Sequence, residues 1–112
     1  MRYLLLIGGA AGPEEGPSSK DICEADDAVA WAEEMTRRGV LVSGEVLQPP
    51  DEARTVRVRD GEVLLADGPF AETKEQIGGL SVIECDTLDE AVAVAAAHPV
   101  ARFGLVEVRP LW

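Results

Sequence analysis

The sequence predicts an α+β protein with a ferredoxin-like sandwich, in which an antiparallel sheet carries two helices on one face. Apolar strand patterns and helical patterns alternate along the chain in the order β-α-β, hairpin, β-α-β. The chain has 112 residues and 46 % of them are hydrophobic, which suits one globular domain with a modest core. We therefore treat residues 1–112 as a single domain.

The first half of the chain predicts a strand, a helix and a second strand. Residues 3–7 are an apolar run typical of a buried strand. Residues 21–38 have helical periodicity, with acidic residues near the start, a basic pair at the end and Gly39 as the stop. Their apolar residues recur three and four apart: Ile22, Ala25, Ala28, Val29, Ala32 and Met35. The second strand is expected over residues 40–47.

A hairpin follows the second strand. Residues 55–59 and 62–66 alternate in polarity around Asp60-Gly61, the residue pair that a type I′ turn favours. Val56 and Val58 fall on one side of the first strand, so we expect one buried face and one solvated face.

The second half predicts another strand, helix and strand. Residues 80–84 are strand-like, and residues 87–90, Thr-Leu-Asp-Glu, form a capping box at the start of a helix that ends at His98. One face of this helix is apolar: Leu88, Ala91, Val92 and Ala95. The last strand spans residues 105–109 and stops at Pro110.

Two helices on one sheet face leave the other face open. The strands are rich in Val, Leu and Ile, so that open face is expected to be partly apolar, and such surfaces usually mark interfaces. A homodimer formed through the open sheet face is therefore predicted.

Charge and cysteine content narrow the functional classes. Ten Lys and Arg against 21 Asp and Glu give a formal net charge of −11, which disfavours nucleic acid and anionic membranes as partners. No apolar run approaches the length of a membrane span. Cys23, Cys85 and His98 make a poor zinc set, so we expect reduced thiols in a cytoplasmic protein without metal or cofactor.

The glycine-rich residues 8–12, Gly-Gly-Ala-Ala-Gly, do not form a dinucleotide-binding motif. A GxGxxG fingerprint would place glycine at position 10 and begin a helix at once, whereas Ala10 stands there and prolines at 13 and 17 follow. A flexible loop is the better interpretation.

Residues 67–79, Asp-Gly-Pro-Phe-Ala-Glu-Thr-Lys-Glu-Gln-Ile-Gly-Gly, carry more polar side chains than a turn requires. The run 67–75, together with residues 44–49, 56–61 and 106–110, resembles the YCII-related family in its DGPF subgroup. The resemblance covers most of the chain except residues 8–20.

This resemblance implies a dimeric α+β barrel built from two ferredoxin-like subunits. It also implies a cleft with a His–Asp pair, which is proposed as catalytic in YCII-like proteins. The short members carry that histidine early in the chain, whereas the first half of this sequence has none, so the pair does not carry over directly. Leu80 stands where subgroup members often have Phe or Tyr.

Two residues are candidates for catalysis. Asp67 would act as a general base if partial burial raised the pKa of its carboxyl group; alternatively, Asp67-Gly68 only shapes a turn. His98 would act as an acid or base near neutral pH; alternatively, it is a structural residue at a helix C-terminus.

Five further residues are candidates for substrate binding. Phe70, Glu72 and Lys74 would line a pocket, with Lys74 neutralising an anion, or else they belong to a solvated loop with weak ion pairs. Glu45 and Arg109 would form a cleft site on strands that a dimer brings together, or else join Glu107 in an interfacial ion-pair network.

The leading functional hypothesis is a small dimer with a polar cleft that binds a small organic molecule. If catalytic, it would perform cofactor-independent acid/base chemistry such as isomerisation or elimination, with Lys74 or Arg109 stabilising the developing anion. The alternative is a non-catalytic accessory module that engages a regulatory protein, since the resemblance extends to proteins associated with extracytoplasmic-function sigma factors.

Overall fold

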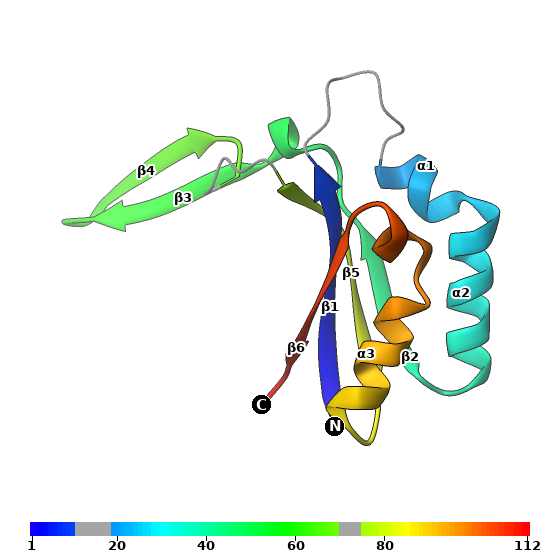
Figure 1. The fold of residues 1–112 in the computed structure, drawn as a ribbon. Coiled ribbons are helices and arrows are strands. Elements are labelled where there is room, and N and C mark those ends of the chain that lie inside the picture. The colour runs from blue at the N-terminus through cyan, green and yellow to red at the C-terminus, as the bar shows by residue number, and fades with distance from the viewer. Residues whose placement is uncertain (11–18, 70–74) are drawn as a thin grey trace.

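A computed structural model describes residues 1–10, 19–69 and 75–112, and these form an α+β fold (Figure 1). Its main sheet has four strands in the order β2-β5-β1-β6, and each neighbouring pair is antiparallel. The strands are β1 (Arg2–Ala10), β2 (Leu41–Val46), β5 (Glu75–Glu84) and β6 (Leu105–Pro110). This arrangement is consistent with a ferredoxin-like α+β fold, as the sequence predicted.

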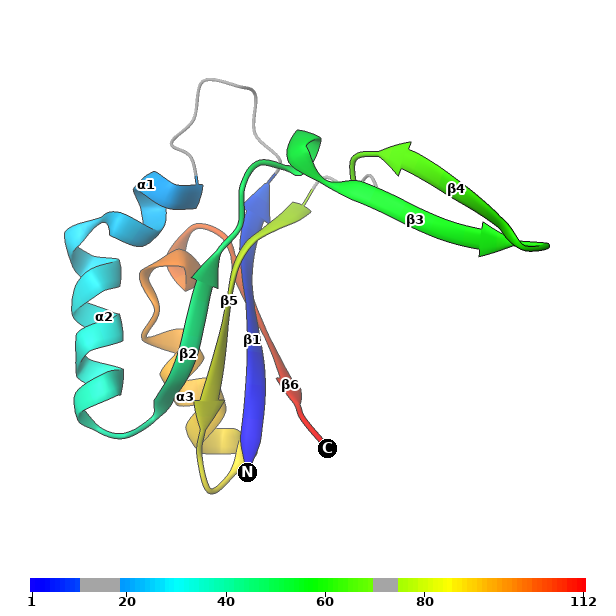
Figure 2. The same ribbon diagram turned by 180° about the vertical axis from the view of Figure 1, so that it is seen from behind.

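The helices cover one face of this sheet and leave the other face open (Figures 1 and 2). They are α1 (Ser19–Glu24), α2 (Asp26–Arg37) and α3 (Leu88–Ala96), with two short 3-10 helices, η1 (Pro50–Glu52) and η2 (Pro99–Arg102). In the described part of the chain, no helix is both long enough and apolar enough to cross a membrane.

The core lies between the helices and the sheet. Alternate residues of the central strands, Tyr3 and Leu5 on β1 and Ile83 on β5, are almost completely buried. The helices contribute a second set of buried residues: Ala28, Trp31, Met35, Ala91, Val94 and Ala95. The Trp31 indole Nε1–H donates to the Val94 carbonyl oxygen at 3.0 Å, which joins α2 to α3 inside the core.

The single helix expected over residues 21–38 is divided in two. Ala25 adopts an extended conformation (φ −61°, ψ 147°) and separates α1 from α2. On α2, Ala28, Trp31 and Met35 are buried, whereas Val29 is exposed. Trp31 is a core residue.

One of the two hydrogen bonds of the predicted capping box at the start of α3 is confirmed. Thr87 Oγ1 accepts from the Glu90 amide at 3.2 Å, while Glu90 Oε2 accepts from the amide of Asp86, one residue before the expected partner. The expected buried face was partly wrong, because Leu88 and Val92 are exposed. The buried stripe contains smaller residues and is set by packing against α2 and the sheet.

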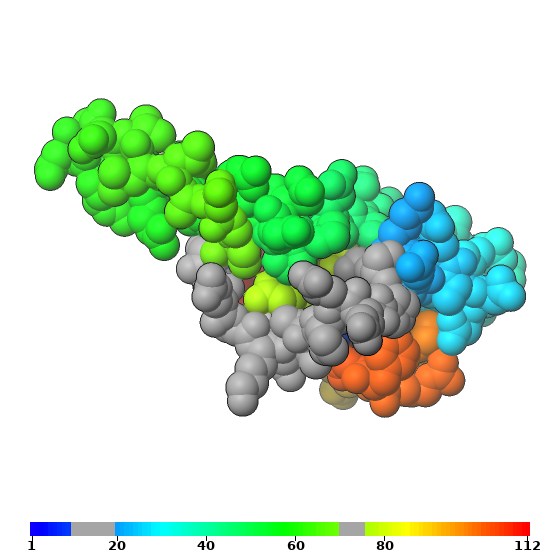
Figure 3. Space-filling view, turned by 90° about the horizontal axis from the view of Figure 1, so that it is seen from above, coloured from blue at the N-terminus to red at the C-terminus, as the bar shows by residue number. Residues whose placement is uncertain are grey.

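The hairpin β3 (Arg54–Arg59) and β4 (Glu62–Asp67) forms a separate two-stranded sheet. Asp60 (φ 52°) and Gly61 (φ 76°) both have positive φ, which confirms the predicted type I′ turn. The expectation that Val56 and Val58 face a core is wrong, since both are exposed. Seen from above, the hairpin projects beyond the body of the molecule (Figure 3), and its large apolar residues are exposed.

The loop expected from residue 8 begins later than predicted. β1 continues through Gly8, Gly9 and Ala10, which pair with β5 after a register shift between Ile7 and Gly8. A Cβ at Gly8 would clash with the carbonyl oxygen of Gln76 on β5. Glycine is therefore required at position 8 by close strand packing, not by a phosphate. Residues 11–18 lie outside the described part of the chain.

Candidate functional site

The open sheet face carries two rows of side chains that combine apolar centres with polar edges. Strand register places Glu45, Leu80, Leu6 and Glu107 in one row across β2, β5, β1 and β6. The neighbouring row contains Ser43, Val82, Leu4 and Arg109. Because side chains alternate between the faces of a strand, both rows lie opposite the core. The result is a half-buried apolar centre with ionisable groups on both sides.

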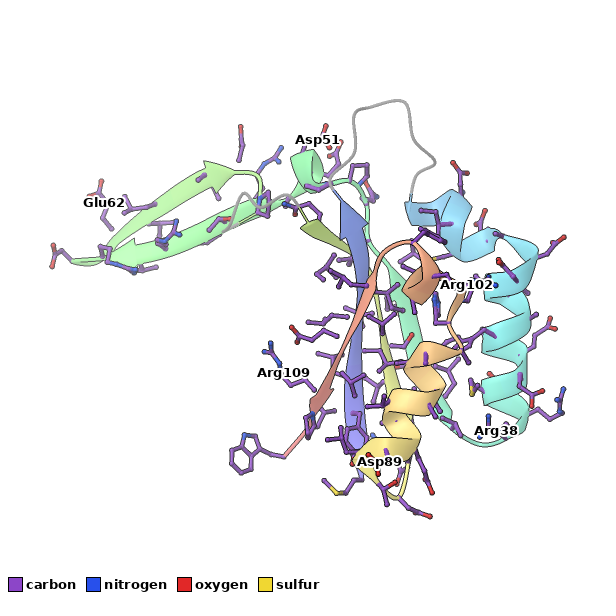
Figure 4. The ribbon with its side chains drawn as sticks, in the orientation of Figure 1. Arg38, Asp51, Glu62, Asp89, Arg102 and Arg109 are labelled. Atoms are coloured by element: carbon purple, nitrogen blue, oxygen red, sulfur yellow. The ribbon has the colours of Figure 1, made fainter. Side chains whose placement is uncertain are left out.

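An ion pair occupies the β6 edge of this face. Arg109 Nη2 lies 2.7 Å from Glu107 Oε2, and both residues are exposed. Figure 4 shows Arg109 directed away from the helices, on the open side of the sheet. A second exposed pair, Arg2 Nε to Glu84 Oε2 at 3.2 Å, lies one row further along. Exposed pairs of this kind contribute little stability, so their guanidinium groups remain accessible to an anionic partner.

Glu45 and Arg109 share the open face but do not meet within one chain. β2 and β6 are the two edge strands of the sheet, with β5 and β1 between them. Strands are about 4.8 Å apart, so the two edges are separated by roughly 14 Å. The two residues therefore do not contact each other within one chain.

Asp67 has a defined structural role at the base of the hairpin. Its Oδ1 lies 3.2 Å from Arg54 Nε, and its side chain is 88 % exposed. Next to it, Gly68 has φ 90° and donates its amide to the Ala53 carbonyl, while Thr55 Oγ1 donates to the Gly68 carbonyl at 2.8 Å. Asp67 and Gly68 thus form the turn at the base of the hairpin, which is one of the two interpretations that the sequence allowed. The partial burial that a general base would require is not present in the single chain.

The sequence contained a signal for the Arg54–Asp67 pair, although Arg54 was not a predicted site residue. A two-residue turn at Asp60-Gly61 fixes the register of both strands, and this register places Arg54 opposite Asp67.

Three candidate binding residues, Phe70, Glu72 and Lys74, lie outside the described residues. The backbone is described again from Glu75, the first residue of β5. The contribution of these three side chains to a site stays a prediction.

His98 is a buried structural residue in this fold. Its Nδ1 accepts from the Val100 amide at 3.1 Å and so caps η2, and its ring packs edge-on against Trp31 with centroids 4.7 Å apart. Because Nδ1 is an acceptor, the neutral ring carries its proton on Nε2. Burial lowers the pKa of His98, while the nearby Asp27 carboxylate acts in the opposite direction. The neutral imidazole is thereby favoured.

The structure does not bring His98 and Asp67 together. His98 belongs to the helical side of the sheet, whereas the hairpin that carries Asp67 projects from the open side (Figure 1). His98 and Asp67 therefore do not form a pair within one chain. His98 also follows the end of α3 at Ala96, so the expected extension of that helix to His98 was too long.

The two thiols are free, and burial raises the pKa of both. Cys85 is buried, and Cys23 is half-buried. Desolvation is the main cause in each, with Glu24 adding to it at Cys23 and Glu90 at Cys85. Across the described ranges, no group of three or more His, Cys, Asp or Glu residues is arranged to hold a metal ion.

The described residues form a small α+β domain in which one face of the main sheet is uncovered and has charged edges. The YCII-related domain model matches residues 1–112, and the chain belongs to this family. The chain is also similar to an uncharacterised protein of Rhizobium meliloti (strain 1021), with 37 % identity over 111 residues. That match covers 80 % of this chain and 88 % of the relative.

Proposed function

We propose that this chain is one subunit of a homodimer that binds a small organic anion in a polar cleft between two open sheet faces. The observation that carries this proposal is the open face itself, where a half-buried apolar centre of Leu4, Leu6, Leu80 and Val82 is bordered by Glu45 and by the Glu107–Arg109 pair. The 67–75 motif further supports membership of the DGPF subgroup, in which such dimers are expected.

The surface of the isolated chain supports association. Its accessible area is 7888 Å² at a mass of 11.9 kDa, whereas a compact monomer of this mass exposes about 5,900 Å². Its radius of gyration is 15.6 Å, compared with about 13 Å for a compact domain of this length. A specific interface typically buries about 800 Å² on each partner, so the excess area is sufficient for one.

A two-fold axis allows two face-to-face arrangements. An axis parallel to the strands places the β2 edge of one subunit opposite the β6 edge of its partner, whereas an axis across the strands places each β2 edge opposite its own copy. Because Glu45 shares a row with Glu107, the first arrangement sets Glu45 opposite Glu107 of the partner subunit, beside the Glu107–Arg109 ion pair. We adopt the first arrangement because it brings Glu45 to the edge that carries Arg109.

The cleft formed in this way suits recognition of a carboxylate or phenolate. Arg109 supplies a guanidinium that binds such oxygens in a planar, bidentate manner, and the apolar centre accommodates the carbon skeleton. Any reaction would be cofactor-independent acid/base chemistry such as isomerisation or elimination. Asp67 would serve as the base only where a partner subunit covers its carboxylate, and Lys74 would join Arg109 in stabilising an anion.

A thermal-shift screen of small carboxylic acids and phenols tests the binding site. A ligand present at 100 times its Kd adds about 2.7 kcal/mol to the stability of the native state, which raises Tm measurably. Arg109→Gln should abolish the shift. Arg102→Gln is the matched control, because Arg102 is an equally exposed arginine that pairs with Asp27 on the helical side. Binding by wild type and Arg102→Gln, but not by Arg109→Gln, is the expected result.

Sedimentation equilibrium tests the dimer independently of any ligand. Wild type should show a dimer mass at micromolar concentration, and Leu6→Asp should be monomeric because it places a charge in the centre of the open face. If wild type dimerises but no ligand shifts its Tm, or if Arg109→Gln responds like Arg102→Gln, the binding site is rejected. The accessory role then becomes the better description.

A further inference from the structure

The β3–β4 hairpin, residues 54–67, is the most exposed apolar element of the described chain and is called the arm below. It pairs with no strand of the main sheet. Both ribbon views show it extending from one end of the sheet on the side opposite the helices (Figures 1 and 2). The arm therefore overhangs the space in front of the open sheet face.

One face of the arm is apolar and lies in water in the single chain. Cross-strand pairing places Val56 opposite Leu65 and Val58 opposite Val63, and these two pairs share a face. Their exposed fractions are high: Val56 60 %, Val58 57 %, Val63 66 % and Leu65 66 %. An isolated two-stranded hairpin is at best marginally stable in water, so this face requires cover.

The arm is nevertheless built as a defined element. The Asp60-Gly61 turn sets its register, and the Arg54–Asp67 ion pair and the Thr55–Gly68 hydrogen bond hold its base. The conformation needed for docking is thus already specified by local interactions, which lowers the entropic cost of association.

Apolar area indicates that the occupant is a second copy of this chain. The arm contains three arginines and three acidic residues, so its net charge is zero and its apolar face is the feature that calls for a partner. The apolar residues of the open sheet face are already half-buried in the single chain, so that face offers a partner only part of their apolar surface. The arm lies on the same side of the molecule and adds further exposed apolar surface.

We propose that each arm packs its Val56, Val58, Val63 and Leu65 face against the other subunit, so that two copies of the chain clasp each other. This inference rests on the homodimer proposed above and adds the element that holds it together. It assigns the exposed hairpin to the dimer interface. The sequence pattern alone predicted a hairpin with one buried face and one solvated face.

Two adjacent leucines provide a matched test by sedimentation equilibrium. Leu65→Thr alters the apolar face of the arm, whereas Leu64→Thr makes the same change on the opposite face, where Leu64 pairs with Arg57. Threonine keeps high strand propensity, so the hairpin is retained in both. Leu65→Thr should weaken dimerisation at least about tenfold, as expected for losing more than one buried methylene, while Leu64→Thr should change it less than about twofold.

Hydrogen–deuterium exchange of the wild type gives a second readout. Amides of residues 54–67 should exchange more slowly as the protein concentration rises through the dimer dissociation constant. A dimer in which both leucine variants associate equally well, with arm exchange independent of concentration, would overturn the clasp and leave the open-face dimer intact. A wild-type protein that stays monomeric at all concentrations would reject both the dimer and the clasp. The mass measured by sedimentation therefore distinguishes failure of the dimer from failure of the clasp alone.

Discussion

At the residue scale, His98 shows how burial can engage a titratable side chain in local structure. Its lone pair on Nδ1 caps η2, and its ring contacts Trp31, so burial favours the neutral form. Protonation would remove the acceptor and place a charge in the core.

We therefore expect His98 to make stability depend on pH. In the unfolded chain its pKa is near 6.5, whereas burial lowers the pKa in the folded state. Below about pH 6.5 the unfolded state binds more protons, so the free energy of unfolding falls as pH falls from about 7 to 5. Urea denaturation across this range should show a steeper decline for wild type than for His98→Asn, which keeps a capping oxygen but cannot titrate. Equal slopes would contradict this role.

Gly8 is the second residue whose chemistry is explained by packing. A side chain there would meet the carbonyl oxygen of Gln76, whereas a Cβ at Gly9 would lie 3.4 Å from the Gly104 Cα. Gly8→Ala should cost about 1–3 kcal/mol of stability, as overpacked sites do, and Gly9→Ala should cost clearly less. Chemical denaturation of the two variants provides the comparison. If Gly8→Ala and Gly9→Ala were equally stable, the close packing of Gly8 against Gln76 would not limit the residue at position 8.

At the element scale, helix α3 begins at a cap that the sequence predicted. Thr87→Ala removes the acceptor for the Glu90 amide and should lower stability by about 1 kcal/mol, or a few degrees in Tm, whereas Thr87→Ser should keep most of it. Thermal unfolding monitored by circular dichroism measures both. A Thr87→Ser variant as unstable as Thr87→Ala would assign the effect to the lost methyl group and not to the cap.

The elements were largely predictable because their signals are local. Helical period, the Asp60-Gly61 turn and the Thr87 cap each depend on a few neighbouring residues. The errors also have local origins. Ala25 leaves the helix although its side chain fits the apolar stripe, and Val29, which was expected on that stripe, is exposed. Leu88 and Val92 were expected in the core because the sequence pattern placed them on the apolar face of the helix, but α3 packs through Ala91, Val94 and Ala95.

At the scale of the whole molecule, association should determine stability. If the open face and the arm are covered by a second copy, then mass action makes Tm depend on protein concentration. Calorimetry over a hundredfold range of concentration should show Tm rising with concentration for wild type. Leu6→Asp should show no such dependence. A constant Tm for wild type would contradict a dimer with a dissociation constant within that range.

The candidate site could be predicted only in part, because it depends on which strands lie next to each other in the sheet. Sequence spacing identified Glu45 and Arg109 as strand residues, but strand order places them at opposite edges of one sheet. The family motif identified Asp67, but its ion pair with Arg54 depends on hairpin register. Phe70, Glu72 and Lys74 remain sequence-based candidates.

The order of strands and helices, the hairpin turn, the cap of α3 and membership of the YCII-related family could all be inferred from the amino-acid sequence. Each of these depends on short-range patterns or on a contiguous motif. The three-dimensional fold was needed to show that Val56 and Val58 lie in solvent, that His98 is buried, and that Glu45 and Arg109 lie apart within one chain. These outcomes depend on which distant segments pack together, because burial is a property of the whole fold and not of a side chain's neighbours in sequence.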